Sequence, residues 1–412
     1  MKNTNPKIIR LFLIILLLLS VMIIVRKCIK SNSNNKTLTI CVSSKTSIHI
    51  PLLKDIISKF EKENHCKIEL KIFSEKEFNY LIKNKKFHDS VCFPDLIEGN
   101  YESIKSYHTQ FSLFSQIPDS LKNNDNVGNT YNSYKYLAIP WLMETKVLFV
   151  NNSLIKKVTK SQPAFKSFKE VLDISGKINS LDSCYGFGIV GPDEENLLNN
   201  LLIFFWSNGG DLLDEKGKLT IYKNANLEAF KFYLQLAENG LIETQMKIES
   251  EFVKGKLGFC ISDYSLIGKI NNENKNLNYS VIEIPKLNDK QGISLMNRRY
   301  FGINSKSKNI ETAMKFLKYI NSEQVSEFII SYQNIGYFPV KKDVIIKHKY
   351  NDEVKSVFAK QIINSKVFQP DNNQNELNKI IETRFIDAIY SVKPADEVFI
   401  EAQEDSRKLI LK

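Results

Sequence analysis

The sequence lacks the short motifs that mark most enzymes and metal sites. Its five histidines are scattered, with no H-E-x-x-H pair and no cysteine beside them at zinc spacing. It contains no G-x-S-x-G turn, and Gly255-Lys256 lacks the glycine five residues earlier that a phosphate-binding P-loop requires. We therefore expect no catalytic residue, no cofactor and no metal ion, and predict that the protein is not an enzyme.

Adjacent carboxylates are the remaining candidates for hydrolytic chemistry. Asp193-Glu194-Glu195 could supply a carboxylate pair of the kind that cleaves glycosides. Acidic residues directly ahead of a helix are more typical of a solvated helix N-terminus, where the helix dipole stabilises them.

Cysteine and arginine are both scarce. The six cysteines include no C-x-x-C pair, which argues against a disulfide framework. Cys41 and Cys66 could pair in an oxidising compartment, but buried free thiols are the simpler interpretation. The net charge is +11, yet no arginine-rich block or basic-aromatic interleaving is present. We therefore expect a dispersed basic surface and no nucleic-acid partner.

The longest apolar run of the chain lies at its N-terminus. Basic residues at positions 2, 7 and 10 precede an apolar run from Leu11 to Val25, the arrangement of an export signal. This run is short for a membrane span, and Cys28 is not preceded by the small residues of a lipoprotein signal. We predict that residues 1–35 form an uncleaved anchor and polar tether, with a cleaved signal as the alternative, so that the protein is exported.

The first part of the chain after this run has a strand–helix–strand pattern. Leu38–Val42 and Lys67–Phe73 are β-rich, and the residues between them place apolar side chains on one helical face. Such a βαβ unit predicts a mainly parallel sheet. Because 412 residues exceed the usual size of one hydrophobic core, we expect two lobes.

The central part of the chain, residues 185–242, has a second distinct pattern. An apolar helix over Leu197–Trp206 should end at Asn208-Gly209-Gly210, where glycine permits a left-handed closure. A small hairpin over residues 212–222 and a second helix should follow, with Asn224 as its cap and Gly240 at its end. Trp206 ends a wholly apolar helix and is expected in the core.

This order of elements resembles family 1 extracellular solute-binding proteins, the capture subunits of ABC importers for sugars, oligosaccharides and glycerol phosphates. The similarity includes the Trp206-Ser-Asn-Gly-Gly-Asp211 segment and the helix that ends in Glu-Asn-Gly-Leu. Further similar motifs follow the same order, namely Phe93-Pro-Asp-Leu-Ile97, Tyr136-Leu-Ala-Ile-Pro-Trp141, the strand before Tyr264 and Gly336-Tyr-Phe-Pro-Val-Lys-Lys-Asp343. Together they cover about residues 38–345.

The resemblance implies an α/β fold, the two-lobed periplasmic-binding-protein fold of type II, with hinge-linked lobes and a ligand cleft between them. The chain would cross between lobes near Pro140–Lys146, Pro285–Arg299 and Phe338–Asp343. Lobe 1 would comprise residues 36–143 and 288–338, and lobe 2 would comprise residues 144–287 and 339–412.

The function that the resemblance implies is capture of a small molecule. The expected ligand is a sugar, an oligosaccharide or a glycerol phosphate, bound by hinge closure and delivered to ABC permease subunits in the membrane. We expect a monomer at the periplasmic or outer face of the cytoplasmic membrane. The alternative is a membrane-tethered sensor or adhesion module that uses the same fold without transport partners.

Sugar sites combine flat aromatic rings with planar amides and carboxylates. Trp141, Tyr264 and Tyr300 are the aromatic residues predicted to contact the faces of a sugar. Asn208 and Asp211 are predicted to bind its hydroxyl groups, although both could instead cap backbone at the helix exit.

Arginine occurs at only six positions in this lysine-rich chain, and two of them are adjacent. Arg298 and Arg299 precede Tyr300-Phe301-Gly302, where the family often has an entry to the cleft. An arginine there could hold a phosphate or carboxylate through two parallel hydrogen bonds, which lysine cannot reproduce. The alternative is a pair of surface arginines on a loop.

Overall fold

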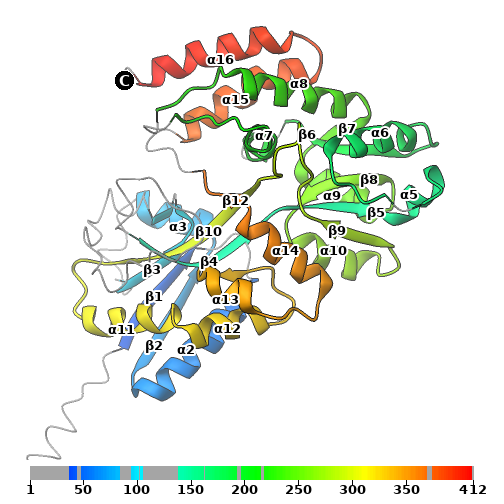
Figure 1. Cartoon of the computed structure of the whole chain (residues 1–412). Coiled ribbons are helices and arrows are strands. Elements are labelled where there is room, and N and C mark those ends of the chain that lie inside the picture. The colour runs from blue at the N-terminus through cyan, green and yellow to red at the C-terminus, as the bar shows by residue number, and fades with distance from the viewer. Residues whose placement is uncertain are drawn as a thin grey trace, which may run out of the picture.

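The computed structural model describes residues 37–43, 48–83, 94–101, 103–104, 138–161, 163–192, 196–214, 218–368 and 374–410. These residues form two α/β lobes, each built on its own sheet (Figure 1). The predicted α/β two-lobed fold is therefore confirmed. The predicted anchor over residues 1–35, together with Cys28, Cys92 and Asp193-Glu194-Glu195, lies outside the described residues.

The first sheet has the strand order β11-β4-β10-β3-β1-β2, with β12 beside β10. Parallel pairing joins β1 to both β2 and β3, whereas β10 runs antiparallel to β3 and β4. Its strands are β1 (Thr37–Ser43), β2 (Lys67–Phe73), β3 (Leu96–Gly99), β4 (Ala138–Thr145), β10 (Ser294–Ile303), β11 (Phe338–Pro339) and β12 (Ser365–Lys366).

The helices of the first lobe cover this sheet because each has one apolar face. In α2 the residues Leu52, Leu53, Ile56 and Phe60 are buried, and Pro51 lies in the first turn. The predicted βαβ unit of β1, α2 and β2 is thus confirmed. The helices are α2 (Ile50–Asn64), α3 (Glu75–Lys83), α11 (Ile310–Ile320) and α12 (Glu323–Ser331).

The second sheet has the order β7-β6-β8-β5-β9. Here β6 pairs in parallel with β7 and β8, while β5 runs antiparallel to β8 and β9. Its strands are β5 (Val147–Asn151), β6 (Tyr185–Val190), β7 (Gly240–Glu243), β8 (Leu257–Ser262) and β9 (Tyr279–Ile282).

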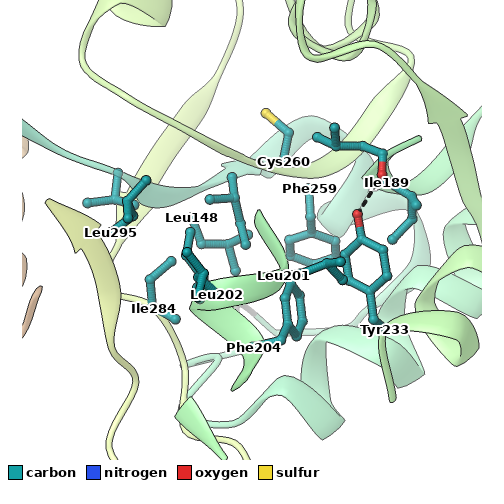
Figure 2. Packing of buried hydrophobic residues seen from close by; sticks show 14 of the residues in the cluster. Leu148, Ile189, Leu201, Leu202, Phe204, Tyr233, Phe259, Cys260, Ile284 and Leu295 are labelled. Carbon is teal, nitrogen blue, oxygen red and sulfur yellow. Dashed lines mark hydrogen bonds between the residues drawn. The ribbon is translucent and has the colours of Figure 1, made fainter. Parts of the chain in front are cut away.

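The helix α7 is the centre of the second core. Leu201, Leu202 and Phe204 are fully buried and pack near Phe259 of β8 (Figure 2). Tyr233 of α8 donates its hydroxyl hydrogen to the backbone oxygen of Val190, which satisfies a polar group inside this core. The helices are α5 (Asn152–Val158), α6 (Phe168–Asn179), α7 (Asn196–Ser207), α8 (Asn224–Glu238), α9 (Gln245–Val253) and α10 (Ser265–Glu273).

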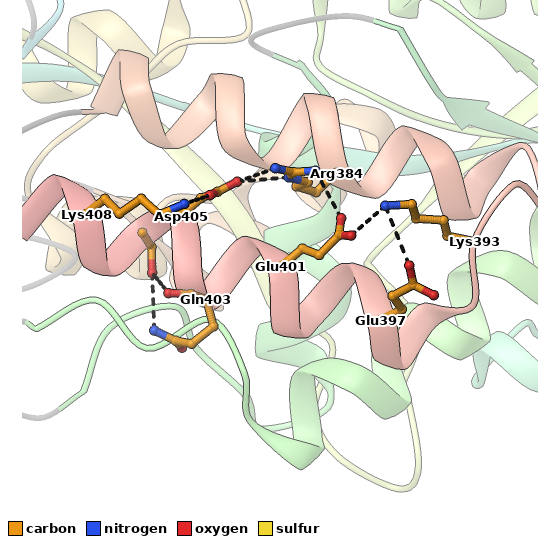
Figure 3. Close-up of polar contacts among 8 residues, drawn as sticks. Arg384, Lys393, Glu397, Glu401, Gln403, Asp405 and Lys408 are labelled. Atoms are coloured by element: carbon orange, nitrogen blue, oxygen red, sulfur yellow. Dashed lines mark hydrogen bonds and ion pairs between the residues drawn. The ribbon is translucent and has the colours of Figure 1, made fainter.

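In the described part of the chain after β11, the helices are α13 (Lys342–Lys347), α14 (Glu353–Ile363), α15 (Gln374–Ile389) and α16 (Ala395–Ile410). The last two form an antiparallel pair over α7 and α8 (Figure 1). Arg384 of α15 pairs with Asp405 and Glu401 of α16, and Lys393 also pairs with Glu401 (Figure 3).

Several local predictions need correction. Lys223 rather than Asn224 is the N-cap of α8, and the helix ends before Asn239, so that Gly240 begins β7. The expected small hairpin is confirmed by an antiparallel bridge between Leu213 and Leu219, although residues 215–217 lie outside the described residues. The backbone N–H groups of Asp214 and Thr220 donate to the oxygens of Lys218 and Leu212 on either side of it. The left-handed closure after α7 is confirmed, since Gly209 has φ +73°.

The helix α6 begins at Phe168, because Ser167 caps it by accepting from the backbone N–H of Glu170. The cysteines at positions 41, 66, 184 and 260 are free thiols, so a disulfide between Cys41 and Cys66 is wrong. None of the described helices is long and apolar enough to cross a membrane.

Candidate functional site

A buried carboxylate organises the first lobe beside the junction of the lobes. Glu98, in β3, is fully buried. Arg299 of β10 donates to it from Nε at 2.6 Å and from a terminal nitrogen at 2.7 Å. Trp141 of β4 donates its indole N–H to the same carboxylate at 3.0 Å, and His49 Nε2 lies 3.5 Å away. Four segments distant in sequence therefore meet at one charged group.

The charge on Glu98 is maintained by these partners. Burial alone would raise its pKa, but the Arg299 guanidinium and His49 more than offset this and lower the pKa to about 2. Arg299 in turn has a raised pKa, because Glu98 outweighs the effect of its burial. Arg299 and Glu98 thus form a bidentate, charge-assisted ion pair that is largely shielded from water.

Arg299 thus has the bidentate geometry expected of it, but its partner is a carboxylate of the same chain. Arg298 is 6% exposed, and its Nε contacts the Met296 sulfur at 3.4 Å. The alternative of two surface arginines is wrong, since both side chains are buried or nearly so. Neither guanidinium is placed as an open anion site in this arrangement.

Two of the predicted aromatic platforms lie in the core. Trp141 is 1% exposed, with its ring 5.4 Å from Phe301 and 6.2 Å from His49. Tyr300 is 5% exposed and packs against Tyr101 at 6.0 Å between ring centroids. Neither ring has a free face, so the structure does not support the prediction that they stack on a sugar. The physical reason is that strand alternation turns both side chains into the lobe.

The exit of α7 is tied to its neighbours by Asn208. Its side chain donates to the Ala225 backbone oxygen at 2.8 Å and accepts from Asn288 at 2.9 Å. Lys290 donates to its backbone oxygen at 2.8 Å. The capping alternative therefore describes Asn208 better than contact with a ligand does, and these bonds join α7, α8 and the turn at residues 287–290.

Asp211 remains more open. One carboxylate oxygen accepts from the Leu213 backbone N–H at 3.3 Å, and the other lies 3.9 Å from the Lys366 ammonium. Its side chain is 35% exposed. Lys366 also lies 5.8 Å from the ring centre of Trp206, which is itself buried in the core as expected.

Tyr264 lies at the junction between the lobes. It directly precedes α10 and packs edge-on against Phe358 of α14, with ring centroids 5.3 Å apart. Burial, aided by Asp352, raises the pKa of its hydroxyl to about 12, so the group remains a hydrogen-bond donor at neutral pH. Among the predicted residues, Tyr264 and Asp211 are the two that keep substantial exposure.

Glu144 is a candidate that sequence reasoning missed. It lies near the end of β4, where the chain leaves the first sheet for the second, and its side chain is partly exposed. It accepts a long hydrogen bond from the Asn297 side chain, at 3.5 Å. Burial and the nearby carboxylate of Asp263 raise its pKa to about 7. The signal was present in the sequence, since this carboxylate follows Trp141 at the first predicted crossing.

Glu144 belongs to the first sheet, whereas Asp263 directly follows β8 of the second. Tyr337 lies in the same region. Burial raises the pKa of its hydroxyl well above the ordinary value, the charges of Glu144 and Asp263 raise it further, and Arg299 acts in the opposite direction. The junction therefore combines carboxylates, a tyrosine hydroxyl and aromatic surface from both lobes. Within the residues that the structure describes, no group of three potential metal ligands occurs.

Comparison with protein families identifies the class of this chain. Residues 55–358 match the model for the bacterial extracellular solute-binding proteins, which is more than half of the chain. The chain belongs to this family. The prediction of an exported binding protein, rather than an enzyme, agrees with the nature of the family.

Curated relatives of this solute-binding protein are distant. A binding protein of Brucella abortus is 27% identical over 226 residues, which cover 51% of this chain and 52% of the relative. The chain thus spans about half the length of that relative. The ABC transporter periplasmic-binding protein YcjN of Escherichia coli is 19% identical over 347 residues, covering 80% of this chain and 79% of YcjN.

Solved structures share the fold of this solute-binding protein. The GacH receptor of Streptomyces glaucescens, studied unliganded and with acarbose, has a TM-score of 0.72 at 19% identity, covering 90% of this chain and 98% of the receptor. MalE of Listeria monocytogenes in complex with maltose has a TM-score of 0.72 at 19% identity, covering 92% of this chain and 99% of MalE. At this level of identity the likeness establishes the two-lobed fold alone.

Proposed function

We propose that this protein is the extracytoplasmic substrate-binding subunit of an ABC importer and captures a neutral sugar or oligosaccharide by hinge closure. The observation that carries the proposal is the electrostatic contact between Glu144 of the first lobe and Asp263 of the second, directly before Tyr264 in the chain. Carboxylates accept hydrogen bonds from sugar hydroxyls, and a tyrosine ring offers an apolar face. Sugar complexes of proteins with the same fold, such as MalE with maltose, support this choice.

A glycerol phosphate fits the junction less well. The Arg299 guanidinium is already held by Glu98 through two hydrogen bonds, and Arg298 is buried. The carboxylates of Glu144 and Asp263 would repel a phosphate at the same place. We therefore favour an uncharged ligand.

The proposed lobe boundaries rest on the strands. In the first sheet, β4 ends at Thr145, and in the second sheet β5 begins at Val147. We therefore assign the first crossing to Lys146. The return of the chain to the first sheet as β10 and β11 supports assigning residues 36–143 and 288–338 to lobe 1. The position of α15 and α16 over α7 and α8 supports placing the C-terminal residues, within 339–412, with lobe 2.

Partners and location follow from the proposed role. The bound sugar would be delivered to ABC permease subunits in the membrane, and the protein would act as a monomer. Residues 1–35 would tether it to the outer face of the cytoplasmic membrane, which keeps the binding lobes near the permease.

A thermal-shift screen of the full chain, in mild detergent, tests the ligand class. The probes are maltose, maltotetraose, acarbose and glycerol 3-phosphate, because a ligand that binds only the folded state raises the Tm with concentration. We expect a shift with at least one of the sugars and none with glycerol 3-phosphate. A shift with glycerol 3-phosphate alone would contradict the proposal.

The variant E144Q tests the proposed contact. At pH 8, where the Glu144 carboxylate is ionised, we expect it to weaken sugar binding by about tenfold or more, since a charged acceptor contributes about 1.5–3 kcal/mol to a hydrogen bond. E273Q, an exposed glutamate on α10, is the matched control and should bind as the wild type does. Equal binding by E144Q and E273Q would remove Glu144 from the site.

A further inference from the structure

A glycine, Gly336, lies directly against the Tyr264 side chain. Gly336 lies between α12 and β11, just before the third predicted crossing. A Cβ added to Gly336 would lie 2.0 Å from the Cβ of Tyr264 and 2.4 Å from its Cγ. Both are far shorter than any tolerated contact between carbon atoms. A side chain at position 336 therefore requires Tyr264 or the backbone to move.

The backbone itself does not demand glycine here. Among the described glycines, the positive φ angles belong to Gly209 and Gly255, and Gly336 has none. An alanine could adopt the local conformation without strain. The requirement for a missing side chain at position 336 thus comes from the neighbour across the contact.

The two sides of the contact belong to different hydrophobic clusters. Ile335 and Tyr337 flank Gly336 and are buried with the core of the first lobe, where the Tyr337 ring lies 5.7 Å from His49. Tyr264 packs instead with the core of the second lobe and is held by Phe358. Gly336 is therefore held by the core of the first lobe, and Tyr264 by the core of the second.

We propose that Gly336 and Tyr264 form the surface on which the two lobes close, and that the missing side chain at position 336 sets how closely they approach. Tyr264 is then a positioning residue for closure as well as a candidate ligand contact. The inference relies on the hinge closure of the proposed function, but not on which sugar binds.

Single-molecule energy transfer between the lobes tests this inference. One dye is attached to an unnatural amino acid at Lys62 of α2 and the other at Lys177 of α6, since both side chains are exposed. The full chain is measured without ligand and with saturating maltotetraose. The variants are G336A, Y264A, Y264A/G336A and the control G268A, whose added Cβ meets nothing within 4 Å.

We expect G336A to lose the high-transfer, compact population that the wild type and G268A show. The double variant Y264A/G336A should match Y264A alone, because the clash is absent from both and any loss of ligand contact is shared. If wild type and G336A share the same distribution, or if Y264A/G336A is less compact than Y264A while both remain folded by circular dichroism, the proposal is overturned. A lower Tm for G336A with an unchanged distribution also overturns it, since the contact would then be fixed packing. A failed sugar screen would leave the ligand-free comparison intact, so the two proposals can fail separately.

Discussion

At the scale of single residues, Glu98 shows why arginine persists in a lysine-rich chain. Lysine offers a point charge, whereas Arg299 makes two parallel hydrogen bonds to a buried carboxylate. Trp141 adds a third donor to the same group. The rarity of arginine was a correct signal of a special role, but that role is structural.

Replacing Glu98 with glutamine should strongly destabilise the protein. The change leaves the Arg299 guanidinium buried without its counter-charge, and breaking a buried pair in this way costs about 3–5 kcal/mol. Urea unfolding measures the loss. E69Q is the control, since Glu69 is an exposed β2 residue whose ion pair with Lys71 should contribute at most about 1 kcal/mol. Equal stability of the two variants would show that Glu98 is not the organising charge of the lobe.

At the scale of elements, α14 is the piece that joins the lobes. It packs against β5 and β9 of the second sheet and against β4 and β10 of the first. From this helix the buried Lys355 donates to the backbone oxygens of Ile330 and Tyr332, at the end of α12. The last carbonyl groups of a helix have no partner within the helix. The Lys355 ammonium of α14 therefore caps the C-terminus of α12.

Replacing Lys355 with methionine should lower the free energy of unfolding by about 1–3 kcal/mol, because two charge-assisted bonds are lost and the carbonyls stay buried. Burial lowers the pKa of this lysine to about 8, so the unfolded state binds more protons between about pH 8 and the ordinary value of 10.5. Stability should consequently rise with pH across that window in the wild type, and less so in K355M. K360M, an exposed change on the same helix, should match the wild type in both measurements. A K355M profile identical to that of K360M would show that the cap is unimportant.

At the scale of the whole molecule, the junction brings together carboxylates from both lobes. Glu144 has a pKa raised to about 7 by burial and by Asp263, whereas Arg299 and Lys146 act in the opposite direction. Between its ordinary pKa of 4.5 and about 7 the folded protein therefore holds a proton that the unfolded chain has lost. Stability should fall as the pH rises through this window and then level off.

The variant E144Q should flatten this part of the pH profile, because glutamine stays neutral. Since the side chain is partly exposed, we expect a difference of about 1–2 kcal/mol between the two ends of the window rather than the full value of the shift. Urea midpoints at several pH values measure it, with E273Q as the control. An E144Q profile as steep as that of the wild type would show that another group is responsible.

The sequence by itself determined the elements and their order. Periodic apolar residues predict α2, α7 and α11 because helix and strand periods depend only on local spacing, and the paired strands β1 and β2 follow from the same patterns. Glycine after α7 predicts the left-handed turn because the constraint is local to that residue.

Only the tertiary structure decided which polar and aromatic residues face a partner. Strand alternation places Trp141 and Glu144 on opposite faces of β4, but only the tertiary structure brings Glu98 to the first and Asp263 to the second. Arg299 finds Glu98 two hundred residues earlier in the chain, and Gly336 meets Tyr264 from another lobe. Such pairings depend on how strands and lobes are brought together, and no local pattern of residues specifies them.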